Sequence, residues 1–290
     1  MEDAKVNNQL LQELIQKYKL SEKEHDVVLE LLKKKLFSDR VAENNPSIMF
    51  VVGQPGCGKT TYINHEDLSQ YVIINSDDYR YLSKYSDEIL DKYPTSYAKL
   101  TNYDAHLWGD ELFSYAIQNR YSVLREKAPI DSSLLELIKT IPNEYDVVLN
   151  VVVAGDLASL LATRERYEKE ILKSDNAKLS NIESHNKCYT LLPDFISKCI
   201  SLGVKVNYVV SFDNQFKVIP VGNDYLEVLQ ELREQSNEHA SFTYEKRMDN
   251  IKQSMINRNA SQEQFDELKK IESVYCEINS YCDNGKLHKK

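Results

Sequence analysis

An eight-residue run has the composition and spacing of a phosphate-binding loop: Gly53-Gln54-Pro55-Gly56-Cys57-Gly58-Lys59-Thr60. Glycines at these positions let successive backbone N–H groups turn toward one anion, and a helix that starts at the end of the loop adds its positive dipole. Lys59 is expected to reach the β- and γ-phosphates of a nucleotide, and the Thr60 hydroxyl to ligate a bridging Mg²⁺. Together with Thr61, these residues predict a binding site for ATP or GTP and hence phosphoryl-transfer chemistry.

The residues before the loop support this prediction. Ile48 to Val52 is a short apolar run rich in β-branched and aromatic residues, as expected of a buried parallel strand, and the loop follows it at once. A glycine-rich turn that binds nothing is the alternative, but such a turn does not require this strand. Cys57 contributes either its backbone alone or, as an acidified thiol near a helix N-terminus, a redox function.

A second candidate follows the next predicted strand. Val72 to Asn75 is largely apolar and leads into Asp77 and Asp78. The carboxyl ends of strands in an open α/β sheet line the ligand crevice, so one of these carboxylates is expected to accept a proton from an acceptor hydroxyl or to help hold the metal. The alternative is an N-cap for the following helix, a position at which Asp is favoured.

In this order the motifs resemble the zeta toxin family of P-loop kinases, whose studied members phosphorylate UDP-N-acetylglucosamine. The resemblance runs from about Ile48 to Phe212, with Cys57 in place of a serine in the family's loop. The family's Asp-x-Asp segment falls on Asn75-Ser76-Asp77, which implies that Asp77 rather than Asp78 is the general base. The resemblance implies transfer of the γ-phosphate of ATP or GTP to a hydroxyl of a small molecule, such as this nucleotide sugar.

The resemblance also implies roles further along the chain. Glu111 matches a substrate-binding glutamate, with Asp110 as the fallback. Arg166 matches the arginine of a Glu-Arg-Tyr-Glu motif, which in the family lies over the transferring phosphate. Lys178 stands where the family has a further arginine, and a lysine lacks the bidentate fork of arginine. The structural alternatives are an Arg166 paired with Glu170 one turn on, a solvated Lys178 and a Glu111 on an exposed helix face.

One segment departs from the family pattern. The family's Glu-Gly-Thr-x-Arg after the third strand appears here as Glu126-Lys127-Ala128-Pro129-Ile130. Glu126 is retained as a substrate-binding residue, whereas the Gly-Thr pair and the arginine are not. Because this loop touches substrate in the family, the change bears on which acceptor is used more than on phosphoryl transfer itself.

The elements that must position these residues alternate between strands and helices. Further strands are expected over 72–75, 121–124, 147–153 and 204–212, and helices over 104–119, 157–172 and 180–202, with Pro193 kinking or interrupting the last. This alternation predicts a parallel sheet covered on both faces, in a three-layer α/β/α P-loop NTPase/kinase fold.

Helical segments flank the predicted kinase domain, which spans residues 46–221. Residues 1–45 contain two amphipathic helical patterns, with a capping box at Ser21 and Glu24, and residues 222–290 read as a charged helical region without a chemistry-bearing cluster. The N-terminal helices either pack on the core or dock a partner.

Composition limits the partners. The chain has 290 residues and a net charge of -9, which argues against a nucleic acid or an anionic membrane as main partner. Its five cysteines lack metal-ligand spacing, and the N-terminus lacks the apolar core of a signal peptide, so reduced thiols and a cytoplasmic location are expected. Two other functions fit: a nucleotide-binding pseudokinase or switch that has lost its substrate loop, and a toxin held inactive by its own helical arms or by a helical antitoxin.

Overall fold

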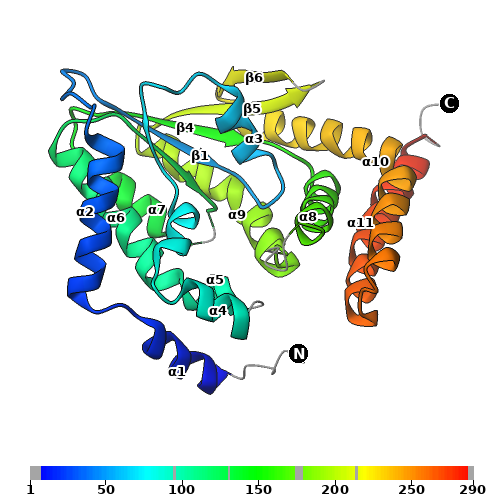
Figure 1. Cartoon of the computed structure of the whole chain (residues 1–290). Helices are drawn as coiled ribbons and strands as arrows, with labels where there is room; N and C mark the ends of the chain where they lie inside the picture. Colours follow the sequence, from blue (N-terminus) through cyan, green and yellow to red (C-terminus); the bar gives the residue numbers. More distant parts are fainter. Residues whose placement is uncertain (1–7, 94–95, 130, 174–178, 213–214, 287–290) are drawn as a thin grey trace. The chain divides into compact units, whose positions relative to one another are not determined.

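The computed structural model describes residues 8–93, 96–129, 131–173, 179–212 and 215–286. Within these ranges lie six strands: β1 (Ser47–Val52), β2 (Val72–Ile74), β3 (Val123–Lys127), β4 (Asp146–Val152), β5 (Lys205–Phe212) and β6 (Gln215–Pro220). They form one sheet in the order β2-β3-β1-β4-β5-β6, flanked by helices (Figure 1). The predicted α/β P-loop fold with helical extensions is confirmed.

The sheet is mixed rather than wholly parallel. The β2–β3 and β4–β5 pairs are parallel as predicted, whereas β6 runs antiparallel to β5. Strand β6 was not predicted, because most of its side chains are exposed and it lacks an apolar run. Lys217 within it and Pro220 at its end are typical of an edge strand.

Strand β3 begins and ends later in the sequence than the strand predicted over 121–124. The strand begins at Val123 and continues through Arg125 to Lys127, so Glu126 lies within the strand and not in a loop after it. The strand predicted over 121–124 stops before the charged residues 125–127, yet the Arg125 side chain is only 1% exposed. Its guanidinium donates to Asp110 at 2.9 Å and lies 5.0 Å from the centre of the Phe113 ring, and these two contacts accommodate the buried charge.

The chain divides into two compact units. Unit 1 comprises Met1–Phe50, Leu68–Glu126 and Ile141–Val147, and unit 2 comprises Val51–Asp67, Lys127–Thr140 and Val148–Lys290. The division predicted from sequence, with boundaries after residues 45 and 221, stays a prediction. Among the helices in the described ranges, none combines the length and apolar character that a membrane crossing requires.

Unit 1 contains the N-terminal helices. Its helical elements are α1 (Asn8–Tyr18), α2 (Glu22–Phe37), the 3₁₀ helix η1 (Ser76–Leu82), α4 (Ser86–Lys92), α5 (Tyr97–Leu100) and α6 (Asn102–Gln118). The predicted capping box is present, because the Ser21 N–H donates to the Glu24 carboxylate at 3.0 Å. The Trp108 indole of α6 donates to the backbone oxygen of His25 in α2 at 3.1 Å. The extension therefore packs on the rest of unit 1.

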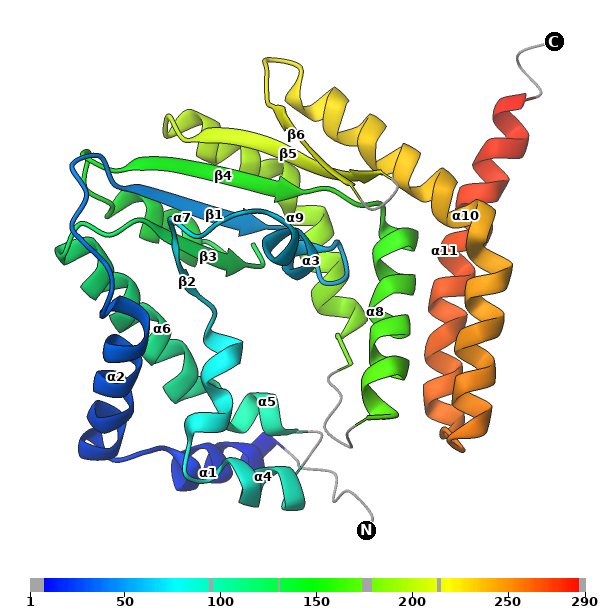
Figure 2. The same ribbon diagram turned by 45° about the horizontal axis from the view of Figure 1, so that its top comes forward.

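Unit 2 contains α3 (Lys59–His65), α7 (Ser133–Lys139), α8 (Asp156–Ile171), α9 (Ile182–Ser201), α10 (Tyr225–Asn257) and α11 (Gln262–Lys286). The last two form a helical hairpin that lies beside α8 (Figures 1 and 2). Apolar side chains of all three helices share one core, among them Leu157, Leu161, Tyr244, Met255 and Leu268.

Helix α9 runs through Pro193 without interruption. A proline cannot donate a backbone hydrogen bond, so the carbonyl of Tyr189, four residues earlier, loses its helical partner. Arg233 of α10 replaces that donor: its Nη2 lies 2.7 Å from the Tyr189 oxygen, and its guanidinium lies 3.7 Å from the centre of the Tyr189 ring. The C-terminal region thus satisfies a backbone group that Pro193 leaves unpaired.

Candidate functional site

The glycine-rich loop joins β1 to α3, as predicted. Gly56 and Gly58 have φ angles of 80° and 101°, a backbone region that residues with side chains rarely adopt. A β-carbon on Gly56 would collide with the carbonyl oxygen of Ser159 and the methyl group of Thr163, both in α8. Glycine is therefore required at position 56, because the loop packs directly against the backbone of α8.

Two side chains of the loop fix its conformation. Gln54 is fully buried, and its amide donates to the Ala154 carbonyl at 2.9 Å and to the Ser159 hydroxyl at 3.3 Å. The ammonium of Lys59, also buried, donates to the carbonyls of Gly53 at 2.9 Å and Gln54 at 3.1 Å. Lys59 therefore lies along the loop, where a cation is needed to bind phosphate oxygens.

These residues fit a magnesium nucleotide. Thr60 and Thr61 are exposed residues in the first turn of α3. Mg²⁺ at a phosphate-binding loop takes one hydroxyl from the loop and further oxygens from the phosphates and water. Within the described ranges no group of three His, Cys, Asp or Glu side chains is arranged to hold a metal ion, and a site of this kind does not need one.

Asp77 and Asp78 lie in η1, directly after β2, in unit 1. The N-cap of η1 is Asn75, whose side-chain oxygen accepts from the Asp77 N–H at 3.2 Å. Neither aspartate is therefore the N-cap of η1, which was the alternative role suggested for them by the sequence. Burial and the neighbouring charge of Asp77 raise the pKa of Asp78.

Arg80 holds the Asp77 carboxylate. Its side chain is 9% exposed and that of Asp77 54% exposed, and one carboxylate oxygen accepts from both Nε and Nη2. The guanidinium also donates to the Ala98 carbonyl at 2.8 Å, to the Thr101 hydroxyl at 3.2 Å and to the Asn102 side chain at 3.1 Å. Arg80 thus connects Asp77 to the segment that joins α5 to α6. Arg80 was not predicted as a site residue, although its spacing of three residues from Asp77 was a signal.

A hollow of about 510 Å³ adjoins the two aspartates. It is lined by side chains of α2 and of the segment from β2 to η1: Leu32, Lys35, Leu36, Ile73, Asp77, Asp78, Tyr79 and Tyr81. The mixture of carboxylates, a lysine and tyrosine hydroxyls suits a polar ligand.

Glu111 of α6 is paired with a histidine of the N-terminal helices. Nε2 of His25 lies 2.7 Å from a Glu111 carboxylate oxygen, and Nδ1 lies 3.3 Å from the Asp104 carboxylate. Glu111 is therefore not simply an exposed residue on a helix face. His25 was not identified from the sequence, because it lies 86 positions from Glu111 and no local pattern connects them. The fallback residue Asp110 pairs with Arg125, and Glu126 is half-buried in β3.

Arg166 lies in α8 with its side chain 46% exposed. Its Nη2 donates to the Ser180 hydroxyl at 3.1 Å, and its Nε lies 3.8 Å from Glu170. The surface pairing with Glu170 that the sequence suggested is thus present, at a distance typical of a weak, solvent-screened ion pair. Lys178 and Ile130 lie outside the described residues.

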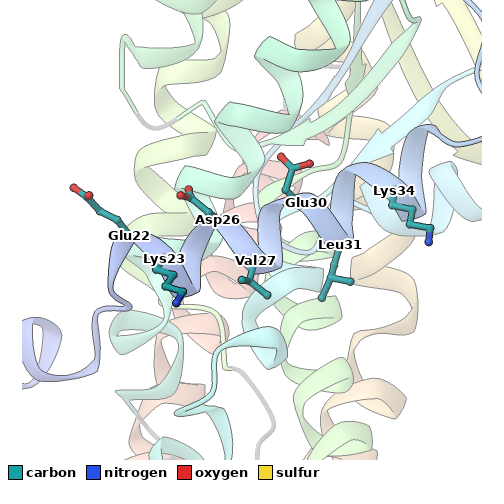
Figure 3. A pocket seen from close by; sticks show the side chains of 7 residues that line it. All are labelled: Glu22, Lys23, Asp26, Val27, Glu30, Leu31 and Lys34. Carbon is teal, nitrogen blue, oxygen red and sulfur yellow. The ribbon is translucent and has the colours of Figure 1, made fainter.

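Another hollow, of about 830 Å³, is formed by one helix only. Figure 3 shows its seven lining residues projecting from α2: Glu22, Lys23, Asp26, Val27, Glu30, Leu31 and Lys34. None of them is a candidate site residue. A single helix face cannot enclose a small ligand, so the chemistry is assigned to the loop and to the carboxylates.

Comparison with known proteins decides the family. The sequence model described as Zeta toxin matches residues 31–219, which include the loop, Asp77, Glu111 and Arg166. The chain belongs to the zeta toxin family. Zeta toxin family proteins are kinase-like phosphotransferases with a P-loop, in agreement with the geometry of residues 53–60. The match leaves α10 and α11 outside the family region.

Individual relatives of the zeta toxin family are distant. Toxin zeta of Streptococcus agalactiae is 26% identical over 157 residues, which are 51% of this chain and 53% of that protein, so the match spans about half of that relative. A structure from the PezAT chromosomal toxin-antitoxin system of Streptococcus pneumoniae aligns with a TM-score of 0.70 and 21% identity, over 81% of this chain and 98% of that chain. The complex AvrRxo1-ORF1:AvrRxo1-ORF2 with sulphate ions aligns with a TM-score of 0.50 and 12% identity, over 80% of this chain and 79% of that chain. At these identities the structural likeness shows the fold alone.

Proposed function

We propose that this protein is a kinase that transfers the γ-phosphate of ATP or GTP to a hydroxyl group of a small molecule, with a nucleotide sugar such as UDP-N-acetylglucosamine as the acceptor class. The observation that carries the proposal is the loop of residues 53–60. It follows a buried strand, contains left-handed glycines at 56 and 58, and contains a buried Lys59, in a chain of the zeta toxin family.

The phosphate-binding loop and α8 supply the residues that act on the phosphoryl donor. The loop amides and Lys59 bind the β- and γ-phosphates, and Thr60 ligates the Mg²⁺. Bound Mg²⁺ supplies charge neutralisation on the phosphates. Arg166, assisted by Lys178, stabilises the negative charge on the transferring phosphoryl group.

A second set of residues is proposed to act on the acceptor. Asp77 orients the acceptor hydroxyl and takes its proton while the oxygen–phosphorus bond forms and the bond to the β-phosphate oxygen breaks, leaving the nucleoside diphosphate. Arg80 keeps the Asp77 carboxylate in one orientation through its two hydrogen bonds. Glu111, held by His25, and Glu126 bind the acceptor.

The test is a transfer assay with an unbiased acceptor pool. The purified protein is incubated with γ-labelled ATP or GTP, first with UDP-N-acetylglucosamine and then with a metabolite extract, and labelled products are identified by mass spectrometry. We expect a labelled product with the parent protein and a strongly reduced yield with Asp77→Asn. Nucleotide binding without transfer to any acceptor would favour the pseudokinase or switch instead.

A toxin role controlled by a partner is a second candidate. It is favoured by the family and by the likeness to a structure from a toxin-antitoxin system. The partner would be a helical antitoxin, with inhibition by the terminal helices as the alternative. Induced expression of the parent chain should arrest growth and expression of Asp77→Asn should not; equal growth with both would oppose the toxin role. Truncation of residues 1–45 is a poor test, because His25, Leu29, Leu32 and Phe37 are buried in unit 1.

A further inference from the structure

The segment that matches the family's Glu-Arg-Tyr-Glu motif, residues 165–168, makes contacts on two different sides of α8. Arg166 contacts Ser180 and Glu170, whereas the residues before and after it contact the C-terminal hairpin. Glu165 accepts two hydrogen bonds from Arg247 of α10, from Nε and from Nη2, each at 2.7 Å. This fork-to-fork geometry fixes the relative orientation of two side chains more strictly than a single contact does.

The second glutamate of the motif, Glu168, is more deeply buried than Glu165. Glu168 is 5% exposed and Arg258 is 13% exposed, and Nε and Nη2 of the arginine each lie 2.8 Å from a carboxylate oxygen. The Ser254 hydroxyl donates to the same carboxylate at 3.0 Å. One residue before the motif, Arg164 donates to Glu267 of α11 at 2.9 Å.

The tyrosine of the motif also faces the hairpin. The Tyr167 hydroxyl accepts from the Gln264 amide at 3.3 Å, and the Arg258 guanidinium lies 5.5 Å from the centre of its ring. Three of the four motif residues, Glu165, Tyr167 and Glu168, therefore contact α10 and α11. Arg166 is the remaining one, and a helix geometry of about 100° per residue turns it away from Arg164 and Glu168.

The hairpin holds α8 along its length. At the first turn, the Asn237 amide of α10 donates to Asp156 at 2.7 Å. Within the first two turns, Leu157, Leu160 and Leu161 are buried in the core shared with the hairpin. Because Gly56 of the phosphate-binding loop packs on the backbone of Ser159, α8 lies in contact with both the loop and the hairpin.

Apolar packing alone would cover α8 but would not define its rotation closely. Buried ion pairs add little net stability, because desolvation offsets their attraction, while their geometry restricts the orientation of the groups that carry them. The orientation of α8 matters for Arg166, since a displacement of about 1 Å in a catalytic group can cost roughly 10²-fold in rate.

We propose that the α10–α11 hairpin is a positioning clamp, in which Arg247 and Arg258 fix the rotation of α8 and thereby aim Arg166 at the transferring phosphate. The inference rests on the proposed function for the role of Arg166. The family match ends at residue 219 and α10 begins at Tyr225, so the clamp is a feature of this chain outside the matched region.

A double-mutant cycle on the full-length protein tests the clamp. The variants are Arg247→Ala, Arg166→Ala and their combination. The readout is the rate at which γ-labelled Mg-ATP loses its label, to the acceptor when UDP-N-acetylglucosamine is present and to water when it is absent. Arg247→Ala is expected to lower kcat about tenfold or more while leaving the KM for ATP unchanged. In the Arg166→Ala background, Arg247→Ala should cause no further loss of kcat, because Arg247 is proposed to act only by positioning Arg166.

Two further variants separate positioning from stability. Exchanging the charges, with Glu165→Arg and Arg247→Glu together, should restore most of kcat. Lys252→Ala is the matched control, since it removes an ion pair of 2.9 Å between α10 and α11 that does not involve α8, and it should leave kcat unchanged. Arg247 is preferred to Arg258 because removing one partner of a buried pair can unfold the chain.

The outcomes distinguish the two proposals. If Arg247→Ala retains full kcat, or if the two losses multiply in the double variant, the hairpin does not act through Arg166 and the clamp is wrong. If the parent protein neither transfers nor releases the γ-phosphate, the proposed function is wrong. If the parent is active but Arg166→Ala has no effect, the kinase function stands, while the role of Arg166 and with it the clamp are wrong.

Discussion

The guanidinium of Arg80 donates two hydrogen bonds to one carboxylate oxygen of Asp77, from Nε at 2.8 Å and from Nη2 at 2.6 Å. Arg80 is in turn bonded to Thr101 and to the Ala98 carbonyl, so the carboxylate is fixed relative to α5 and α6. A base held this way needs no reorganisation before it takes a proton.

Replacement of Arg80 should therefore impair catalysis. Arg80→Lys keeps the charge but loses the planar fork, and both Arg80→Lys and Arg80→Ala are expected to lower kcat about tenfold or more with little change in the KM for ATP. Steady-state kinetics together with a thermal unfolding measurement of each variant check this. Full activity of Arg80→Lys would mean that charge alone suffices and that the fork has no positioning role.

Asp77→Asn should leave the fold and nucleotide binding intact and slow phosphoryl transfer. Asparagine keeps the shape of the side chain but cannot accept the proton, and a positioned base contributes about 10²- to 10⁴-fold. Asp78→Asn is the control in the same single-turnover assay. An inactive Asp78→Asn beside an active Asp77→Asn would show that the base is the neighbouring residue.

Lys59→Ala is expected to lose most of the affinity for Mg-nucleotide or most of the turnover. In the structure the Lys59 ammonium donates to the carbonyls of Gly53 and Gln54. The variant removes this cation, which is expected to reach the β- and γ-phosphates of a bound nucleotide. Calorimetric titration with Mg-ATP and Mg-GTP measures the effect and the base preference together. Binding and turnover equal to those of the parent would refute the assignment of the loop.

His25→Gln should weaken acceptor binding through Glu111. The ring nitrogen 2.7 Å from Glu111 restrains that carboxylate, and loss of a hydrogen bond to a charged group corresponds to roughly a tenfold effect. We expect a higher KM for the acceptor and an unchanged KM for ATP. The exposed His239 of α10 provides the control substitution, His239→Gln. Equal shifts in both KM values would indicate general loss of structure in unit 1.

The free energy of unfolding should fall as the pH drops below about 6.5, which is the usual pKa of a histidine in an unfolded chain. Burial lowers the pKa of His185, whose Nε2 lies 2.7 Å from the Ser159 hydroxyl. The unfolded chain therefore binds a proton that the folded chain does not, so acid favours unfolding and neutral pH favours folding. Urea unfolding at pH 7.5 and 5.5 should show a smaller difference for His185→Gln than for the parent. His239→Gln should show the parent's difference.

The chemistry of the loop was readable from the sequence because it depends on consecutive residues. Gly53 to Thr60 carry their function in local backbone conformation, and apolar runs mark the strands β1, β2, β4 and β5. The same holds for the capping box at Ser21, whose two partners are three residues apart.

The environment of the site depends on pairs that no local pattern connects. Glu111 meets His25 across 86 positions, and Glu168 meets Arg258 across 90. From the sequence, Arg125 lay just outside the strand predicted over 121–124 and Arg258 lay in a charged helical region, because a charged residue signals exposure unless its partner is known. Packing supplies those partners: Asp110 and Phe113 for Arg125, and Glu168 for Arg258. The sequence by itself therefore determined the family and the phosphate-binding loop, whereas only the tertiary structure decided which side chains orient Asp77, Glu111 and the helix of Arg166.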